Sequence, residues 1–280
     1  MGLAASVLAA LLALAAPSGS RVTHDLAYGP GERGRLDVYR PRRQAAAPEP
    51  LVVFLYGGGW QSGDKAFYRF IGATLASRGL VVAIPDYRVF PQVRYPDFLR
   101  DNALAVRFAR DHAAEWGADP GRLFLVGHSA GAYDVAMLAL DRRWLGQAGL
   151  DPRRDIAGAV GLAGPYDFLP LRDEKLKIIF GPEQTRADTQ PINHVDGRAP
   201  PMLLLAGDKD RVVDPGNATR LAAAIATRGG EVEARILPDL GHVGVLTAIL
   251  GPFRHRGPVL RSILDFIARR PAVDAARLAA

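Results

Sequence analysis

Residues 122–140 read RLFLVGHSAGAYDVAMLAL, and this stretch decides the fold. A short apolar, β-prone run reaches the pattern G-x-S-x-G at residues 127–131 and passes at once into an Ala- and Leu-rich helical pattern. The motif needs this strand, turn and helix, because its serine sits on the sharp turn between the other two. Glycines two positions before and two positions after Ser129 let the strand and the helix approach closely. We therefore expect the Ser129 hydroxyl to project from the turn as a nucleophile.

The composition favours one globular domain and excludes several classes of function. The net charge of +6 comes from small scattered groups, without a dense basic run or interleaved aromatic residues, so we expect no nucleic-acid partner. The chain has no cysteine, which excludes disulfides, thiolate nucleophiles and thiolate metal sites. Its six histidines lack the tight spacing of metal ligands, so we expect no metal.

Strand patterns and helical patterns alternate along most of the chain, which predicts an α/β fold with a mostly parallel sheet of about eight strands flanked by helices. The predicted strands are residues 22–26, 36–39, 51–56, 80–84, 122–126, 156–162, 202–206 and 232–237. The predicted helices are the one that follows Ser129 and residues 67–77, 98–115, 217–227 and 259–268.

One segment within the domain extends beyond these repeating units. Some forty residues, 163–201, separate two successive strands, and this surplus at the carboxyl end of the sheet predicts a short cap over the site. We expect residues 22–280 to form a single domain that includes this cap.

The first 21 residues allow two interpretations. Residues 2–16 are small and apolar, too few to span a bilayer, and they have the length of a signal-peptide core with Ala13 and Ala15 as an A-x-A cleavage pattern. No Lys or Arg precedes them, however, and the alternative is an apolar N-terminal helix packed on the domain. The first interpretation implies a periplasmic or secreted protein, the second a cytoplasmic one, and neither predicts a stable membrane span.

A serine hydroxyl needs a base to take its proton, and the base needs a carboxylate to orient it. The strand at 202–206 leads to three candidate carboxylates, of which we favour Asp210 over Asp208 and Asp214. His242 follows the last predicted strand, in a loop with flanking glycines, and is the expected base. The order Ser, Asp, His is the order that this architecture requires.

Another glycine-rich stretch follows the buried strand at 51–56. Residues 57–59 are three successive glycines before Trp60, and such a path allows N–H groups to point into a cavity, where they stabilise a developing alkoxide.

Together these motifs resemble the α/β-hydrolase superfamily, within it the esterase and lipase group related to hormone-sensitive lipase and to arylformamidase-like enzymes. The motifs that carry the resemblance are YGGGW at 56–60, DYR at 86–88, GHSAG at 127–131, GDKDRVV at 207–213 and GH at 241–242. The resemblance implies Ser129 as nucleophile, His242 as base and Asp210 as orienting acid. It also implies an oxyanion hole made by the amides of three residues: Gly58, Gly59 and Ala130. The group usually has a histidine where this chain has Tyr56, which changes how the glycine loop is held.

The expected function is a serine carboxylesterase that acts on small-molecule esters of short to medium acyl length and needs no cofactor. Two alternatives remain open. The resemblance also permits hydrolysis of an N-formyl aromatic amide, for which Trp60, Tyr166 and Phe168 would form an aromatic pocket, although each is typical of ordinary packing. A non-catalytic binding module on the same fold is the third hypothesis.

Overall fold

A single eight-stranded sheet forms the centre of the computed structural model, which describes residues 19–43 and 45–273. The strands are β1 (Ser20–Ala27), β2 (Arg35–Pro41), β3 (Glu49–Leu55), β4 (Val81–Pro85), β5 (Ala118–His128), β6 (Gly158–Leu162), β7 (Met202–Gly207) and β8 (Val232–Leu237). Their order is β1-β2-β4-β3-β5-β6-β7-β8. The pairs β1/β2 and β2/β4 are antiparallel, and all other pairs are parallel. The predicted mostly parallel sheet of about eight strands is therefore confirmed.

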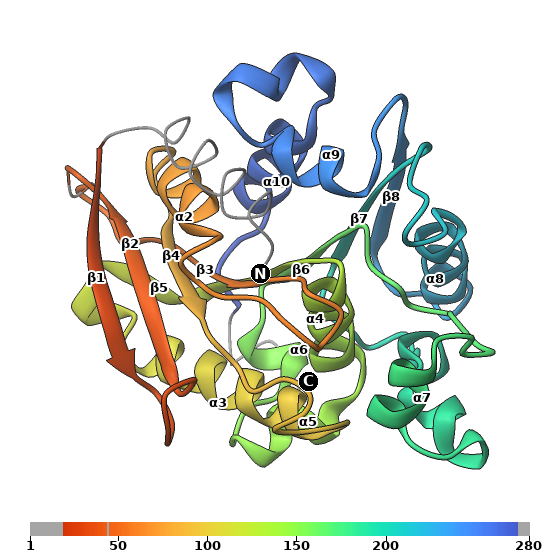
Figure 1. The fold of residues 1–280 in the computed structure, drawn as a ribbon. Coiled ribbons are helices and arrows are strands. Elements are labelled where there is room, and N and C mark those ends of the chain that lie inside the picture. Colours follow the sequence, from red (N-terminus) through yellow and green to blue (C-terminus); the bar gives the residue numbers. More distant parts are fainter. Residues whose placement is uncertain (1–18, 44, 274–280) are drawn as a thin grey trace.

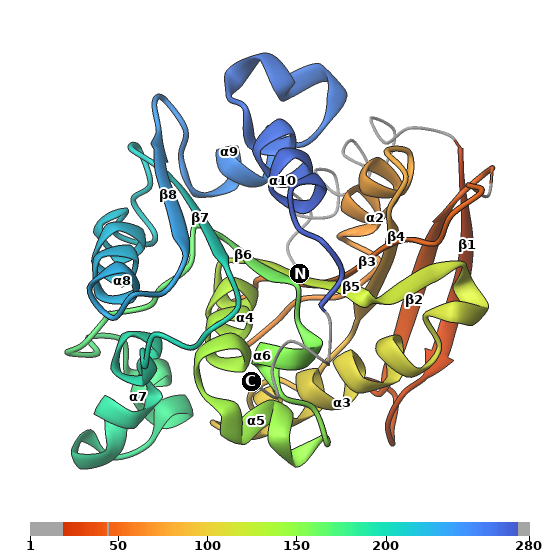
Figure 2. The same cartoon turned by 180° about the vertical axis from the view of Figure 1, so that it is seen from behind.

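Helices cover both faces of this sheet (Figures 1 and 2). The helices α2 (Arg69–Ala76) and α10 (Val259–Ala268) lie on one face, and α3 (Asp97–Asp111) and α4 (Ala130–Leu140) lie on the other. Because the central strands are covered on both sides, every residue of β4, β6 and β7 is buried. Their continuous apolar sequences follow from this burial.

Shorter elements complete the fold. They are α5 (Arg142–Gln147), α6 (Pro152–Asp155), α7 (Glu174–Phe180), α8 (Gly216–Thr227), α9 (His242–Thr247) and the 3₁₀ helices η1 (Ala114–Trp116), η2 (Glu183–Thr189), η3 (Pro191–His194) and η4 (Gly251–Arg256). Residues 163–201 carry α7, η2 and η3 between β6 and β7. The helix predicted for 98–115 ends at Asp111 and is followed by η1 as a separate turn.

The predicted signal peptide or apolar helix at residues 1–21 falls almost entirely outside the described residues. Within the described part, Ser20 already begins β1, which pairs with β2. None of the described helices combines the length and the apolar character needed to cross a membrane.

Candidate active site

Ser129 lies on the turn between β5 and α4, and its backbone has φ +55° and ψ −121°. This left-handed φ is strained for a residue with a side chain. The two flanking glycines explain how the turn closes. A Cβ on Gly127 would lie 2.2 Å from the carbonyl oxygen of Gly131, and one on Gly131 would lie 2.1 Å from that of Leu55. Any side chain at either position would push the strand and the helix apart.

A continuous chain of hydrogen bonds joins Ser129 to an acid. The Ser129 Oγ lies 2.8 Å from Nε2 of His242, and Nδ1 of His242 lies 2.8 Å from Oδ2 of Asp210. The geometry fits the tautomer in which Nδ1–H donates to the carboxylate and Nε2 accepts from the serine hydroxyl. The structure therefore brings the three residues predicted from the sequence together at the carboxyl ends of β5, β7 and β8. His242 itself begins the short helix α9, where the sequence predicted a loop.

The Asp210 side chain is held by the backbone that follows it. Its second oxygen, Oδ1, accepts the N–H groups of Val212 and Val213, both at 2.9 Å, and its side chain is fully buried. The competing carboxylates point elsewhere: Asp208 lies 3.4 Å from Nζ of Lys209, and Asp214 accepts the N–H of Gly216. Of the three aspartates, Asp210 is thus the one that contacts His242.

A second histidine supports the first. His128 is buried, and its Nε2 lies 3.2 Å from the backbone carbonyl oxygen of His242, to which it donates. The two imidazole rings lie 4.9 Å apart between centroids. Burial, together with the neighbouring His242, lowers the pKa of His128 to about 3. His128 is therefore a neutral donor that fixes the backbone of His242.

The glycine loop after β3 lies beside Ser129. The N–H groups of Gly58, Gly59 and Ala130 donate to no acceptor in the part of the chain that the structure describes. Gly59 and Ala130 line the same cleft as Ser129. The amides of Gly59 and Ala130 thus remain able to donate to a ligand in this cleft, whereas Gly58 is not among the residues that line it.

Tyr56, which stands where the esterase group usually has a histidine, ties this loop to two other segments. Its hydroxyl donates to Oδ1 of Asp86 at 2.9 Å and accepts from Nη1 of Arg33 at 3.1 Å. Arg33 also donates to the carbonyl oxygens of Gly63 and Tyr87. Because Arg33 comes from the loop between β1 and β2, the edge of the sheet braces the glycine loop.

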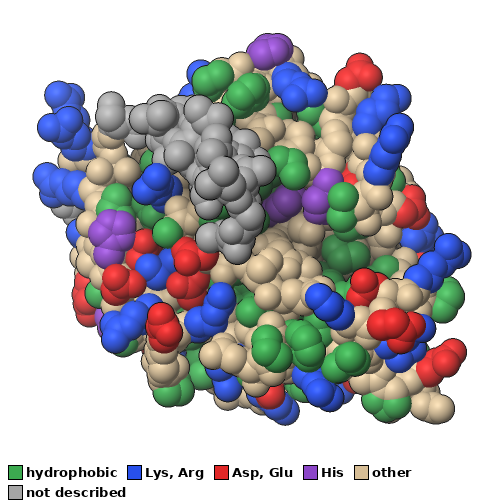
Figure 3. Space-filling view, in the orientation of Figure 1, with side chains coloured by type: hydrophobic (Ala, Val, Ile, Leu, Met, Phe, Trp, Pro, Cys, Tyr) green, Lys and Arg blue, Asp and Glu red, His purple; other side chains and the backbone are tan. Residues whose placement is uncertain are grey.

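Ser129 lines a cleft with a volume of about 840 Å³. Figure 3 shows this face of the molecule, with histidine side chains beside a hollow near its centre and hydrophobic and basic side chains around the rim. Trp60 and Phe168 line the cleft, with ring planes only 16° apart and centroids separated by 6.1 Å. Tyr166 does not line it. Its ring is buried, and its hydroxyl lies where a Cβ on Gly161 would be, so it packs against the sheet rather than facing a ligand.

Trp60 is positioned by a buried carboxyl group that the sequence analysis missed. Oδ1 of Asp134 accepts from Trp60 Nε1 at 3.1 Å, and its Oδ2 accepts from Asn102 Nδ2 at 3.0 Å. Asp134 is fully buried, and burial raises its pKa well above the ordinary range. Asp134 is the one charged residue in the otherwise apolar sequence 130–140, and this contrast is the feature of the sequence that could have indicated a special role for it.

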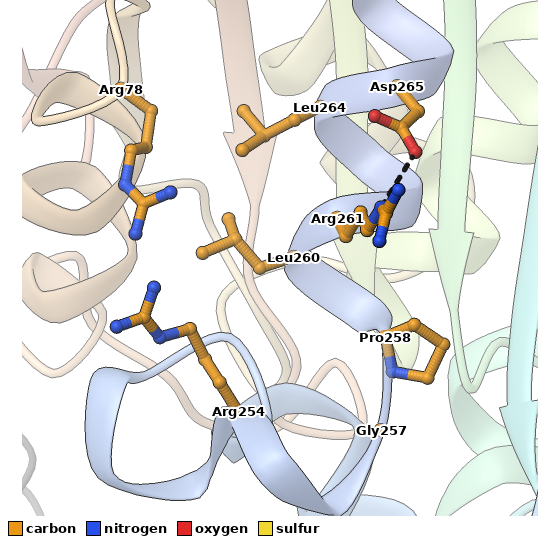
Figure 4. Close-up of a pocket in the computed structure, with 8 residues that line it drawn as sticks. All are labelled: Arg78, Arg254, Gly257, Pro258, Leu260, Arg261, Leu264 and Asp265. Carbon is orange, nitrogen blue, oxygen red and sulfur yellow. Dashed lines mark ion pairs between the residues drawn. The ribbon is translucent and has the colours of Figure 1, made fainter.

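A separate hollow of about 340 Å³ lies between the end of α2 and α10 (Figure 4). Its lining includes no serine or histidine, and its one acid, Asp265, pairs with Arg261. It therefore lacks a nucleophile and a base. Among the described residues, no group of three or more His, Asp or Glu side chains is placed to hold a metal ion.

The comparison with protein families agrees with this geometry. Residues 36–225 match the BD-FAE family. This chain belongs to the BD-FAE family. The match covers the glycine loop, the turn that carries Ser129 and the loop that carries Asp210, whereas His242 lies beyond it.

This BD-FAE chain is similar to esterases in sequence and in structure. It is 32% identical over 231 residues to a probable isoprenylcysteine alpha-carbonyl methylesterase, ICMEL1, of Arabidopsis thaliana, a match that covers 75% of this chain and 48% of the relative. Esterase 2 of Thermogutta terrifontis superposes with a TM-score of 0.67 at 26% identity, covering 90% of this chain and 93% of that one. Esterase B of Lactobacillus rhamnosis, in a phosphonate-inhibited form, superposes with a TM-score of 0.79 at 19% identity, covering 94% and 92% of the two chains.

These matches confirm the predicted α/β-hydrolase fold and its esterase and lipase group. The BD-FAE chain spans about half the length of the Arabidopsis relative that it matches.

Proposed function

We propose that this chain is a serine carboxylesterase that cleaves short- to medium-chain carboxylic esters through an acyl-enzyme. The observation that carries the proposal is the unbroken chain of hydrogen bonds from Ser129 through His242 to Asp210 at the wall of an open cleft. Esterase names among relatives and structural neighbours support the same reaction class.

In the first half of the reaction, Ser129 Oγ attacks the ester carbonyl carbon while Nε2 of His242 takes the hydroxyl proton. The carbonyl π bond breaks, and its electron pair becomes an oxyanion. Amides of Gly58, Gly59 and Ala130 donate to this oxygen. When the tetrahedral intermediate collapses, the bond to the alkoxy oxygen breaks and His242 returns the proton to the leaving alcohol.

In the second half, water replaces the alcohol. His242 takes one proton from the water, the resulting hydroxide attacks the acyl carbonyl, and the ester bond to Ser129 breaks. The proton held by His242 returns to Ser129 Oγ, and the carboxylic acid leaves. Asp210 keeps the imidazole in its working tautomer and stabilises the imidazolium in both halves.

We also propose that residues 22–280 form one domain in which residues 163–201, the cap segment, build a wall of the cleft. The cap segment supplies Phe168, Leu171 and Leu176 to the lining. It is brief, and a cleft of about 840 Å³ suits short and medium acyl groups better than a long fatty chain.

Turnover of 4-nitrophenyl acetate, butyrate and octanoate tests the proposed activity. We expect Ser129→Ala to lower kcat by about 10⁴-fold or more, because the covalent route disappears. A fluorophosphonate probe should label the wild-type protein and leave Ser129→Ala unlabelled. Equal turnover by both proteins would overturn the proposal, and a wild-type protein that neither turns over esters nor reacts with the probe would instead be a binding module.

Amide hydrolysis is the second candidate, and the two nearly parallel rings of Trp60 and Phe168 at the cleft favour an aromatic substrate for it. Matched phenyl formate and formanilide substrates separate the two reactions. A kcat/KM higher by about tenfold or more for the amide would replace the esterase with an amidase.

A further inference from the structure

We infer that the preferred substrates are esters carrying a carboxylate, which Arg172 and Arg211 bind at the cleft. The inference rests on the proposed esterase activity and adds the class of ester. Its basis is that some of the charged side chains that line the cleft with Ser129 bind other groups of the protein, whereas two do not. These side chains are Asp167, Asp173, Asp214, Arg172, Arg211 and Arg220.

The three acids already bind donors of the protein. Arg220 Nε lies 2.6 Å from Oδ2 of Asp167, and its Nη1 lies 3.0 Å from Oδ2 of Asp214. The N–H of Gly216 also donates to Asp214, and together with Arg220 it holds the pKa of that carboxyl below its usual range. Asp167 and Asp214 are thereby both paired with Arg220.

Asp173 is also engaged. Its Oδ1 accepts the N–H of Leu176 at 2.9 Å and caps the first turn of α7. The remaining acid of the cleft is therefore directed at the helix terminus.

Arg172 and Arg211 are different, because neither makes a side-chain hydrogen bond or an ion pair with residues 19–43 or 45–273. Both are exposed, so their guanidinium groups keep their hydration and can accept an incoming anion without first breaking an internal contact. A guanidinium binds a carboxylate through two parallel N–H···O bonds, a geometry that neutral esters cannot use.

The backbone holds both arginines at the cleft that Ser129 also lines. Arg211 directly follows Asp210, and the next two N–H groups donate to the Asp210 carboxylate, so its Cα has a fixed position relative to the catalytic acid. Arg172 lies between the buried Leu171 and the helix cap Asp173. The two cations come from separate segments that line one cleft, and each places there a guanidinium group that has no carboxylate partner among the described residues.

The hollow of Figure 4 supplies a matched control. Arg78 and Arg254 reach toward that hollow and, within the described residues, make no side-chain hydrogen bond or ion pair. Substituting them changes the net charge by the same amount as substituting Arg172 and Arg211, without touching the cleft that holds Ser129.

Two pairs of isosteric esters test the inference and locate the charge. 4-Acetoxybenzoate and 4-acetoxybenzamide place the carboxylate, or its neutral replacement, on the leaving group. The mono-4-nitrophenyl ester of terephthalic acid and its terephthalamide analogue place it on the acyl group. The ratio of kcat/KM for the charged and the neutral member is compared between proteins, so that intrinsic reactivity cancels.

We expect Arg172→Gln/Arg211→Gln to lower this ratio by about fivefold in one pair or both, with the neutral member changed by less than about twofold. Added salt of about 0.5 M should lower the wild-type ratio in the same direction. Arg78→Gln/Arg254→Gln should leave the ratio at its wild-type value. An unchanged ratio in the cleft variant, or an equal fall in the control variant, would overturn the inference.

A binding measurement separates this inference from the proposed activity. Ser129→Ala protein does not turn over the ester, so binding of 4-acetoxybenzoate to it can be titrated directly. Adding Arg172→Gln/Arg211→Gln to this Ser129→Ala protein should weaken binding of 4-acetoxybenzoate by about fivefold and leave binding of 4-acetoxybenzamide unchanged. If 4-acetoxybenzoate and 4-acetoxybenzamide bind equally well, with and without the two arginine substitutions, the inference is overturned even if esterase activity is present. Loss of activity toward all four esters, with this binding difference intact, would instead contradict the proposed function alone.

Discussion

Two neighbouring histidines at the site have different environments and therefore different roles. The His242 side chain is 11% exposed and lies within hydrogen-bond distance of both Ser129 and Asp210. His128 is buried beneath it, with a pKa lowered to about 3 and a hydrogen bond to the His242 carbonyl. The G-x-S-x-G motif thus contributes the proposed nucleophile and also a neutral hydrogen-bond donor to the backbone of the proposed base.

The buried His128 should make folding stability depend on pH. Its pKa is about 3 in the folded state and about 6.5 in an unfolded chain. Between these two pH values the unfolded chain binds a proton at His128 that the folded protein does not bind. The free energy of unfolding is therefore unaffected by this group above about pH 6.5, and it decreases as the pH falls from there toward about 3. Between about pH 7 and about pH 5, this one group should lower the free energy of unfolding by about 2 kcal/mol.

His128→Gln checks this prediction, because a glutamine amide can still donate to the His242 carbonyl but does not titrate. Urea unfolding at the two pH values should show a loss of stability about 2 kcal/mol smaller in the variant than in wild type. Other groups titrate equally in both proteins and cancel in the difference. If both proteins lose the same free energy, His128 is not held in its neutral form by the fold.

At the scale of an element, the loop after β3 depends on one glycine. Gly58 has φ +148°, and a Cβ there would lie 2.0 Å from the carbonyl oxygen of Ser62. Gly58→Ala must therefore shift the loop and the amides that the proposed mechanism uses. We expect kcat to fall about 100-fold, corresponding to about 3 kcal/mol of transition-state stabilisation, while KM changes by less than about threefold.

Gly146→Ala is the matched control, because a Cβ at this position of α5 would meet nothing within 4 Å. It should keep the wild-type kcat and thermal midpoint. A Gly58→Ala protein with wild-type kcat would show that the loop does not carry the oxyanion donors.

The elements that the sequence predicts well are those whose causes are local. Sterics around Ser129 require the strand, turn and helix, and apolar runs predict the buried strands. The meeting of Asp210 and His242 follows because parallel strands end at one edge of the sheet. By contrast, α9 has six residues, too few to show a helical period, so His242 was expected in a loop.

Contacts between distant segments were beyond sequence reasoning. Asp134 contacts Trp60 and Asn102, which lie 74 and 32 residues away along the chain, and nothing local marks that pairing. Tyr166 was expected in the pocket because aromatic residues suit pockets, yet its packing against glycine-rich β6 depends on the fold of the sheet. Only the arrangement of the elements in space decides which aromatic ring faces the ligand.

At the scale of the whole molecule, an aromatic cluster joins the cap segment to the body. Phe180, at the end of α7, is buried with its ring centroid 4.8 Å from that of Trp60 and 5.6 Å from that of Tyr133. A hydrogen bond reinforces the junction: the Tyr133 hydroxyl donates to the backbone carbonyl of Thr189 at 2.7 Å. The cap segment therefore shares its core with α4, the helix that follows Ser129.

This shared core predicts that the cap segment and the body unfold together. Phe180→Ala should lower the free energy of unfolding by about 4 kcal/mol, because it removes a buried ring and leaves a cavity against Trp60. Calorimetry should show one transition at a lower midpoint, and KM should rise because Trp60 and Phe168 lose a packing partner at the cleft. Ile178→Ala on the same helix is the control: its side chain is 43% exposed, so its substitution should cost less than about 0.5 kcal/mol. If Phe180→Ala costs no more than Ile178→Ala, or if a separate transition of lower midpoint appears, the cap segment folds independently and residues 22–280 are not one cooperative domain.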